Sequence, residues 1–179
     1  MALPELQKVT TQQLSIRDLA ALRAFLNGAF DDDFPDEDWD HCLGGVHVVV
    51  RDGDSFISHA AVVERQLVAG DRPLHTGYVE GVATRSQSQG QGHGSRVMNA
   101  VGQIISDGFE MGALGTGRIH FYARLGWELW QGPTSVSAPT GPQRTPEEDG
   151  SVMVLRTEAT RDLDLTTELM CDPRAGDVW

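Results

Sequence analysis

The sequence predicts a fold of the α+β class, with helices and strands mixed along the chain. Three observations predict it: a helical stripe of apolar residues near the start, three strands separated by tight turns, and a central strand, glycine loop, helix and strand unit. With 179 residues, 40% of them hydrophobic, the chain can bury a core. Nothing in the composition requires a second domain, so we expect residues 1–179 to form a single one.

The first half of the chain supplies two helices and most of the extended segments. Ser15 and Asp18 have the spacing of a helix N-cap and its third residue, and apolar residues follow at helical period. Residues 31–35 end this helix at a proline, and the acidic start of 36–43 predicts a short second helix. Turn sequences separate the extended segments. These are expected at residues 8–13, 46–51, 56–68 and 74–84.

The second half begins with a glycine-rich loop and the most regular helix of the chain. Apolar residues between Val97 and Ile105 recur on one side of that helix. A proline-rich loop over 132–150 and an acidic tail ending at Trp179 carry no clear periodicity. Further strands or extended segments are expected at 111–114, 127–131 and 151–157, and a further helix at 118–125.

The charge excludes some partners and favours others. Twenty-six acidic residues against fourteen basic ones give a net charge of −12, which disfavours nucleic acid and favours a cationic ligand. The two cysteines lie far apart, as expected in a reducing cytoplasm, and the histidines lack metal-like spacing. No apolar stretch is long enough for a membrane span. We therefore expect a cytoplasmic protein with no metal, no membrane and no nucleic acid.

The glycine-rich loop is the strongest local signal. It carries Gln89, Gly90, Gln91, Gly92, His93 and Gly94 between a predicted strand and a predicted helix. Backbone amides of such a loop, with the free donors of the helix start, can bind a phosphate or pyrophosphate. A turn that merely caps the helix is the other interpretation.

The distribution of acids around this loop favours the phosphate interpretation. Residues 81–106 contain no carboxylate, whereas the mean density of the chain would place about four there. Arg85, His93 and Arg96 lie in the same stretch. A bound anion would otherwise be repelled by the net negative charge.

Two motifs in the right order resemble the Gcn5-related N-acetyltransferase (GNAT) superfamily. They are Gln89-x-x-Gly92-x-Gly94 and, after the next strand, Phe121-Tyr122-x-x-x-Gly126-Trp127. The resemblance implies a GNAT fold, in which a mixed, mostly antiparallel central sheet is flanked by helices. Two central strands splay apart in that fold and hold acetyl-CoA as co-substrate.

Other segments narrow the resemblance to the aminoglycoside 2'-N-acetyltransferases. They are Tyr78-Val-Glu80-Gly-Val, Gly132-Pro-Thr-Ser-Val, Ala138-Pro-Thr-Gly-Pro and the ending Met170-Cys-Asp-Pro-Arg-Ala-Gly-Asp-Val-Trp179. The similarity spans about residues 24–179. It implies direct acetyl transfer to the 2'-amine in a ternary complex, antibiotic resistance as the outcome, and a homodimer.

The resemblance also implies roles for individual residues. The Val82 N–H, after a bulge in the strand, would polarise the acetyl carbonyl, with Ala83 and Thr84 pairing with the pantetheine arm. Glu80 would be the catalytic base, on the same strand face as Val82. Tyr122 would be the acid toward the sulfur. A salt-bridged strand carboxylate and a packed core aromatic are the ordinary interpretations of Glu80 and Tyr122.

Carboxylates and other acceptors would bind the polycationic aminoglycoside. The positions implied by the resemblance are Asp33, Glu80, Gly81, Gly115, Glu148, Asp149, Asp177 and the terminal carboxylate of Trp179. The acidic clusters near Asp33 and Asp149 also read as a helix break and a solvated turn. Two other functions stay open. One is acetylation of another polycation, such as a polyamine, a cell-envelope amino sugar or a peptide terminus, and the other is a non-catalytic acyl-CoA sensor.

Overall fold

A computed structural model describes residues 4–179, which divide into two compact units. Unit 1 comprises Met1–Val63, described from residue 4, and Val79–Val101. Unit 2 comprises Glu64–Tyr78 and Gly102–Trp179. The two longest strands, β3 (Ser55–Ala69) and β4 (Arg72–Thr84), each pass from one unit into the other.

Unit 1 contains an antiparallel sheet in the order β1-β2-β3, together with the second part of β4. The strands β1 (Glu5–Thr10) and β2 (Val46–Asp52) pair from Glu5↔Arg51 to Thr10↔Val46. The remaining elements of this unit are the short 3-10 helices η1 (Thr11–Gln13) and η2 (Ser86–Ser88), the helices α1 (Ile16–Ala29) and α2 (Asp36–His41), and the first part of α3 (His93–Gly108).

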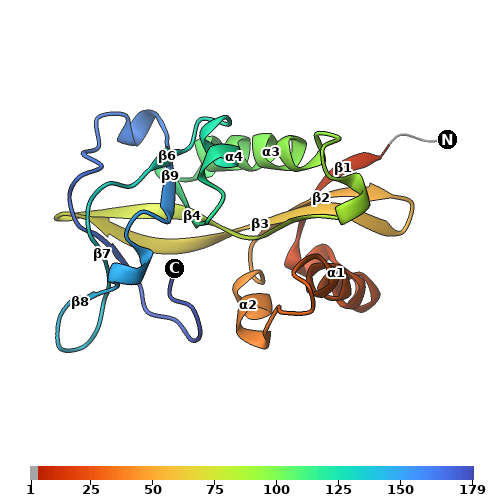
Figure 1. Cartoon of the computed structure of the whole chain (residues 1–179), viewed down its shortest axis with the longest axis horizontal. Coiled ribbons are helices and arrows are strands. Elements are labelled where there is room, and N and C mark those ends of the chain that lie inside the picture. The colour runs from red at the N-terminus through yellow and green to blue at the C-terminus, as the bar shows by residue number, and fades with distance from the viewer. Residues whose placement is uncertain (1–3) are drawn as a thin grey trace. The chain divides into compact units, whose positions relative to one another are not determined.

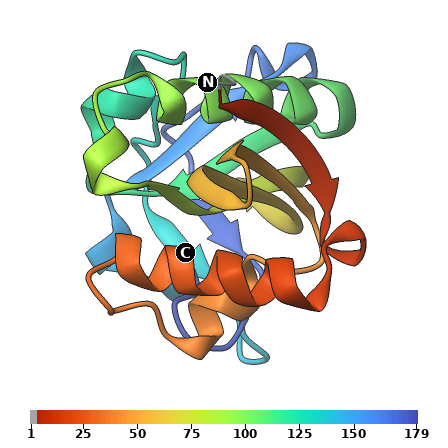
Figure 2. The ribbon, with the colours of Figure 1, turned by 90° about the vertical axis from the view of Figure 1, so that its right-hand side faces the viewer.

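The apolar side of α1 forms the core of unit 1. Ser15 caps the helix by accepting the backbone N–H of Asp18, as the sequence predicts. Leu22 and Leu26 are fully buried and belong to one cluster with Trp39 of α2 and strand residues of β2 to β4. Figure 2 shows α1 and α3 on opposite sides of the strands of this unit. Burial of the apolar stripe therefore fixes α1 on the sheet.

Unit 2 contains a sheet in the order β6-β9-β5-β4-β3-β10-β7-β8. Two of its neighbouring pairs are parallel, β4 with β5 and β10 with β7. Its further elements are β5 (Met111–Gly115), α4 (Ile119–Ala123), β6 (Glu128–Leu129), β7 (Thr134–Val136), β8 (Gln143–Arg144), η3 (Pro146–Glu148), β9 (Val152–Arg156), η4 (Glu158–Thr160) and β10 (Leu169–Cys171). The end of the chain lies beside η3 and β7 (Figure 1).

The α+β class and the order of the main elements are confirmed, with three differences. The first strand is Glu5–Thr10 rather than residues 8–13, because a 3-10 turn occupies 11–13. The expected loop over 132–150 contains β7 and β8, and the tail contains β10. Strands of two or three residues are too short to show a period, and their partners are distant in sequence. Within residues 4–179, no helix has the length and apolar character needed to cross a membrane.

Candidate active site

Gly81 interrupts β4 with a left-handed backbone, at a φ of 58°. A Cβ at this position would lie 2.8 Å from Sγ of Cys42, so both the backbone and the space require glycine. His59 Nδ1 donates to the carbonyl oxygen of Gly81 at 2.7 Å. The structure thus contains a kink in the strand where the resemblance implies a bulge.

Glu80 and Val82 flank this kink, and both are half-buried. The argument that they share a face assumes extended backbone at the residue between them. That assumption is wrong, because the positive φ of Gly81 breaks the regular two-residue alternation. The kink at Gly81, and not the regular alternation of a strand, therefore sets the directions of the Glu80 and Val82 side chains.

The residues after the kink are held by side chains within unit 1. Ser58 Oγ donates to the carbonyl oxygen of Ala83 at 2.9 Å and lies 2.8 Å from Oγ1 of Thr84. Gln89 Nε2 donates to the carbonyl oxygen of Thr84 at 3.3 Å. Ala83 and Thr84 therefore follow a fixed course into the glycine-rich loop.

The glycine-rich loop ends at the N-terminus of α3. Gly90 and Gly92 have φ values of 75° and 83°, and a Cβ at either would meet nothing within 4 Å. The carbonyl oxygen of Gly92 accepts the Arg96 N–H at 3.0 Å, so the helix begins at His93. The first amides of a helix have no acceptor inside it. Open space, glycine backbone and free amides make this loop fit the pyrophosphate of acetyl-CoA.

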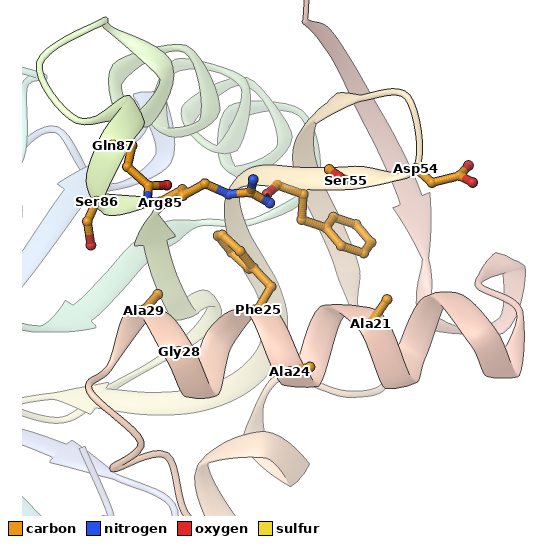
Figure 3. Close-up of a pocket in the computed structure, with 11 residues that line it drawn as sticks. Ala21, Ala24, Phe25, Gly28, Ala29, Asp54, Ser55, Arg85, Ser86 and Gln87 are labelled. Atoms are coloured by element: carbon orange, nitrogen blue, oxygen red, sulfur yellow. Dashed lines mark hydrogen bonds between the residues drawn. The ribbon is translucent and has the colours of Figure 1, made fainter.

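A cavity of about 580 Å³ in unit 1 lies next to the start of this loop. Arg85 and Ser86 lie on one side of it, with Ala24 and Ala29 of α1 on the other (Figure 3). Arg85 Nη2 donates to the carbonyl oxygen of Phe56 at 2.7 Å. The cavity lining is Ala21, Ala24, Phe25, Gly28, Ala29, Asp54, Ser55, Phe56, Arg85, Ser86 and Gln87. It therefore contains none of the residues implied by the resemblance.

Tyr122 lies in α4 of unit 2 and is only 6% exposed. Its ring contacts those of Phe121 and Trp127 edge-on, with centroids 4.9 and 6.2 Å away. Burial raises the pKa of the Tyr122 phenol to about 12, although Arg118 and Thr116 act in the other direction. The phenol therefore carries its proton at neutral pH.

The main chain of Trp179 is held against the end of β5 in unit 2. A Cβ at Gly115 would lie 3.6 Å from the Trp179 carbonyl carbon and 3.7 Å from the Tyr78 hydroxyl. Arg174 Nη2 donates to the main-chain oxygen of Trp179 at 3.0 Å, and Asp177 Oδ1 accepts the Trp179 N–H at 3.0 Å. Gly115, Asp177 and Trp179 are thus brought together.

A row of hydroxyl groups connects the Trp179 side chain to Asp149. The indole Nε1 donates to Oγ1 of Thr145, which donates to Oγ1 of Thr134, each at 2.9 Å. Asp149 Oδ1 accepts the Thr134 backbone N–H at 2.8 Å, and Asp149 Oδ2 accepts from Arg144 at 2.7 Å. These bonds, led by that of Arg144, hold the pKa of Asp149 well below its usual range.

A buried arginine anchors the segment that leads to Trp179. Arg65 is 5% exposed, and its Nη1 donates to the Val178 carbonyl oxygen at 2.9 Å. Its Nε forms an ion pair with Asp172 at 2.9 Å. The acidic tail is therefore a packed part of unit 2.

The candidates implied by the resemblance fall into both units. Unit 1 holds Asp33, Glu80, Gly81, Val82, Ala83, Thr84, Gln89, Gly90, Gln91, Gly92, His93 and Gly94, and unit 2 holds Gly115, Tyr122, Glu148, Asp149, Asp177 and Trp179. Asp33 lies exposed in the turn after α1, and Glu148 Oε2 accepts a hydrogen bond from Ser151 at 2.7 Å.

Sequence reasoning missed His59, Thr134, Thr145 and Arg65, which hold the candidates in place. Each is buried and bonds to a residue that is distant in sequence. No spacing pattern carries such contacts, so the sequence offers no signal for them.

Comparisons with known proteins show the family of the chain. Residues 10–130 match the family model described as an acetyltransferase (GNAT) domain. An aminoglycoside 2'-N-acetyltransferase of Mycolicibacterium fortuitum is 44% identical over 176 residues, covering 96% of this chain and 90% of that relative.

Two solved structures illustrate the likeness in fold. The GNAT family N-acetyltransferase YhbS of Escherichia coli, crystallised in complex with CoA, gives a TM-score of 0.67 at 16% identity, covering 94% of this chain and 89% of its own. A probable N-acyltransferase of Enterococcus faecalis gives 0.60 at 13% identity over 72% of this chain, which spans only 33% of that protein. At these identities the structures show the fold alone. With a family model that covers most of its residues, the chain belongs to the GNAT family of acetyltransferases.

Proposed function

We propose that this protein is an acetyl-CoA-dependent aminoglycoside 2'-N-acetyltransferase, with residues 1–179 as its single catalytic domain. The observation that carries the proposal is the 44% identity to the M. fortuitum enzyme over 96% of the chain. The glycine-rich loop, the protonated Tyr122 and the ordered carboxylates around Trp179 support it. Resistance to aminoglycosides is the expected consequence of this activity.

When bound, acetyl-CoA supplies an acetyl group on a thioester, whose C–S bond breaks as the C–N bond of the product forms. Gln89 to Gly94 would hold the pyrophosphate, and Ala83 and Thr84 the pantetheine arm. The Val82 N–H would donate to the oxygen on which negative charge develops. Removal of one such donor costs about 10²–10³ in rate.

The proton transfers are assigned to Glu80 and Tyr122. Glu80 would accept the proton lost by the 2'-amine as it becomes an amide, directly or through water. Tyr122 would give its proton to the departing sulfur, which leaves as the thiol. Because the pKa of Tyr122 is about 12, the phenol is available as an acid across the physiological range.

The substrate is a polycation, and the acidic character of the chain suits it. Asp33, Gly81, Gly115, Glu148, Asp149, Asp177 and Trp179 are the proposed contacts. Asp149 and Asp177 are ordered by bonds to Thr134 and Trp179 before any substrate arrives. Pre-ordered carboxylates reduce the entropy cost of binding a multiply charged ligand.

The test compares kanamycin B, which has a 2'-amine, with kanamycin A, which has a 2'-hydroxyl at the same position. We expect acetyl-CoA-dependent thiol release with kanamycin B only, and mass spectrometry should place one acetyl group on the 2'-nitrogen. Turnover of both compounds would contradict the 2' assignment. Turnover of neither, with rapid acetylation of spermidine, would instead support a polyamine acetyltransferase.

Two finer features of the proposal have different grounds: the resemblance implies a homodimer, and the two distant cysteines favour a reducing cytoplasm. We expect a homodimer, which sedimentation of the purified protein at several concentrations would detect. We also expect the protein in the cytoplasm, where acetyl-CoA is available, and fractionation of the native cells would check this.

A further inference from the structure

A row of buried hydrogen bonds crosses unit 1 and ends at the kink of β4. Thr11 Oγ1 lies 2.9 Å from His47 Nε2, and His47 Nδ1 lies 2.9 Å from His59 Nε2. His59 Nδ1 lies 2.7 Å from the carbonyl oxygen of Gly81. Both imidazoles are fully buried. The row joins η1, β2, β3 and β4.

The position of each imidazole proton in this row follows from the end at Gly81. The carbonyl oxygen of Gly81 can only accept, so Nδ1 of His59 must donate. A neutral His59 then accepts at Nε2, which makes Nδ1 of His47 the donor and leaves its Nε2 to accept from Thr11. Thr11 Oγ1 in turn accepts the backbone N–H of Gly44 at 2.9 Å. Both histidines are therefore Nδ1–H tautomers.

Burial keeps both rings neutral, as this assignment requires. It lowers the pKa of His47 to about 4. It lowers the pKa of His59 to about 3, with a smaller contribution from His47 and an opposing one from the hydrogen bond to Gly81. At neutral pH the pair thus has one donor and one acceptor on each ring.

The bond to Gly81 also fixes the N–H of the next residue. The carbonyl oxygen of Gly81 and the N–H of Val82 belong to the same peptide group, which is planar and trans. They therefore point in opposite directions, and holding one aims the other. A hydrogen bond to the oxygen also polarises the amide, which makes its N–H a better donor.

We propose that His59, supported by His47 and Thr11, is a positioning residue that aims and polarises the Val82 N–H for the acyl-transfer step. The proposal rests on the function proposed above, in which that N–H stabilises the developing negative charge. It explains why two neutral histidines occupy the core of unit 1 although neither lies at a metal-like spacing.

Two substitutions of His59 separate its hydrogen bond to Gly81 from the packing of its side chain. The amide nitrogen of asparagine lies about where Nδ1 of histidine lies, and the amide oxygen of glutamine can take the place of Nε2 and accept from His47. His59→Asn therefore keeps a donor for Gly81, and His59→Gln keeps only the contact with His47. We expect kcat of His59→Gln to be about 10- to 100-fold below that of His59→Asn, with similar KM values for acetyl-CoA.

A control variant tests whether any loss of a bond to β4 has this effect. Thr76 donates within β4, at 3.1 Å, to the Leu74 carbonyl oxygen, which belongs to a different peptide group. Thr76→Val should lower thermal stability as much as the His59 variants or less, and should leave kcat within about twofold. Equal kcat values for His59→Asn and His59→Gln, or a matching loss of kcat in Thr76→Val, would overturn the proposal.

Nitrogen NMR of the imidazoles provides a readout that does not depend on turnover. In the wild-type protein at neutral pH, His47 and His59 should both show protonated Nδ1 and unprotonated Nε2. The His59 variants identify the signals. A His59 ring protonated at Nε2 or at both nitrogens would refute the inference, whereas wild-type protein inactive on kanamycin B with the expected tautomers would refute only the proposed function.

Discussion

Substitution of Gly81 by alanine tests the kink in β4 most directly. The new residue must keep a φ of 58°, which costs an L-residue about 1–2 kcal/mol. Its Cβ would also lie 2.8 Å from the buried Sγ of Cys42. Overpacking of this kind costs about 1–3 kcal/mol more. The free energy of unfolding should therefore fall by about 2–5 kcal/mol.

Gly53 provides a matched control for this variant. Its φ is 57°, and a Cβ there would meet nothing within 4 Å. Gly53→Ala should therefore show the backbone cost without the steric one. The two variants should differ by about 1–3 kcal/mol, or about 2–12 °C in melting temperature for a chain of this size.

Urea unfolding and thermal melting of both variants measure this difference. A third protein, Gly81→Ala combined with Cys42→Ala, removes the sulfur and should show a coupling energy of at least about 0.5 kcal/mol. If Gly81→Ala is no less stable than Gly53→Ala within about 0.5 kcal/mol, the close approach to Cys42 does not constrain the strand.

Three further predictions concern catalysis, the tail and acid stability. Tyr122→Phe should lower kcat about 10²-fold and leave the dissociation constant of acetyl-CoA unchanged, as steady-state kinetics and calorimetry would show. Trp179→Phe removes the donor to Thr145 and should lower the free energy of unfolding by about 1–2 kcal/mol in urea, with Phe25→Leu at a half-buried site of unit 1 as the control. The pKa of Asp18 is lowered by hydrogen bonds from Ser15 and then Arg51. The ionised carboxylate therefore stabilises the folded protein at pH values above the pKa of Asp18 in the unfolded chain. This stabilisation is lost as pH falls through the lower pKa of Asp18 in the folded protein. Asp18→Asn should therefore be less stable than wild type at pH 7 and equal to it at a pH below both pKa values; a difference that persists in acid would contradict this.

The elements in which apolar residues recur at a regular spacing were predictable from sequence. The apolar residues at helical period from Ile16 to Phe30 and the cap at Ser15 predict α1 almost to the residue. The three-residue strand β10 was not predictable, because it pairs with β3 and β7, which lie far away in sequence. Local pattern cannot describe an element whose partners are all distant.

The candidate site likewise has residues that the sequence predicts and residues that it does not. The glycines at 90 and 92 and the sequence around Tyr122 are visible as motifs, and the structure gives them the backbone and burial that those motifs require. The contacts that orient the site are not visible, because His59 and Thr145 bond to residues far away in sequence. A histidine read from sequence shows neither its tautomer nor its partner. The assumption of a regular pleat at Glu80 also failed, because the φ of the next residue, Gly81, is positive.

Because β3 belongs to both units, it affects the order in which the parts of the chain can fold during synthesis. On the ribosome, all residues of unit 1 are available once Val101 has emerged. Leu67 must wait for Cys171, its partner in β10, which lies 104 positions later. Contacts of such long range form slowly and leave a strand edge open during synthesis. The half of β3 whose edge stays open until β10 forms should therefore be the segment of the nascent chain that most needs protection by a chaperone.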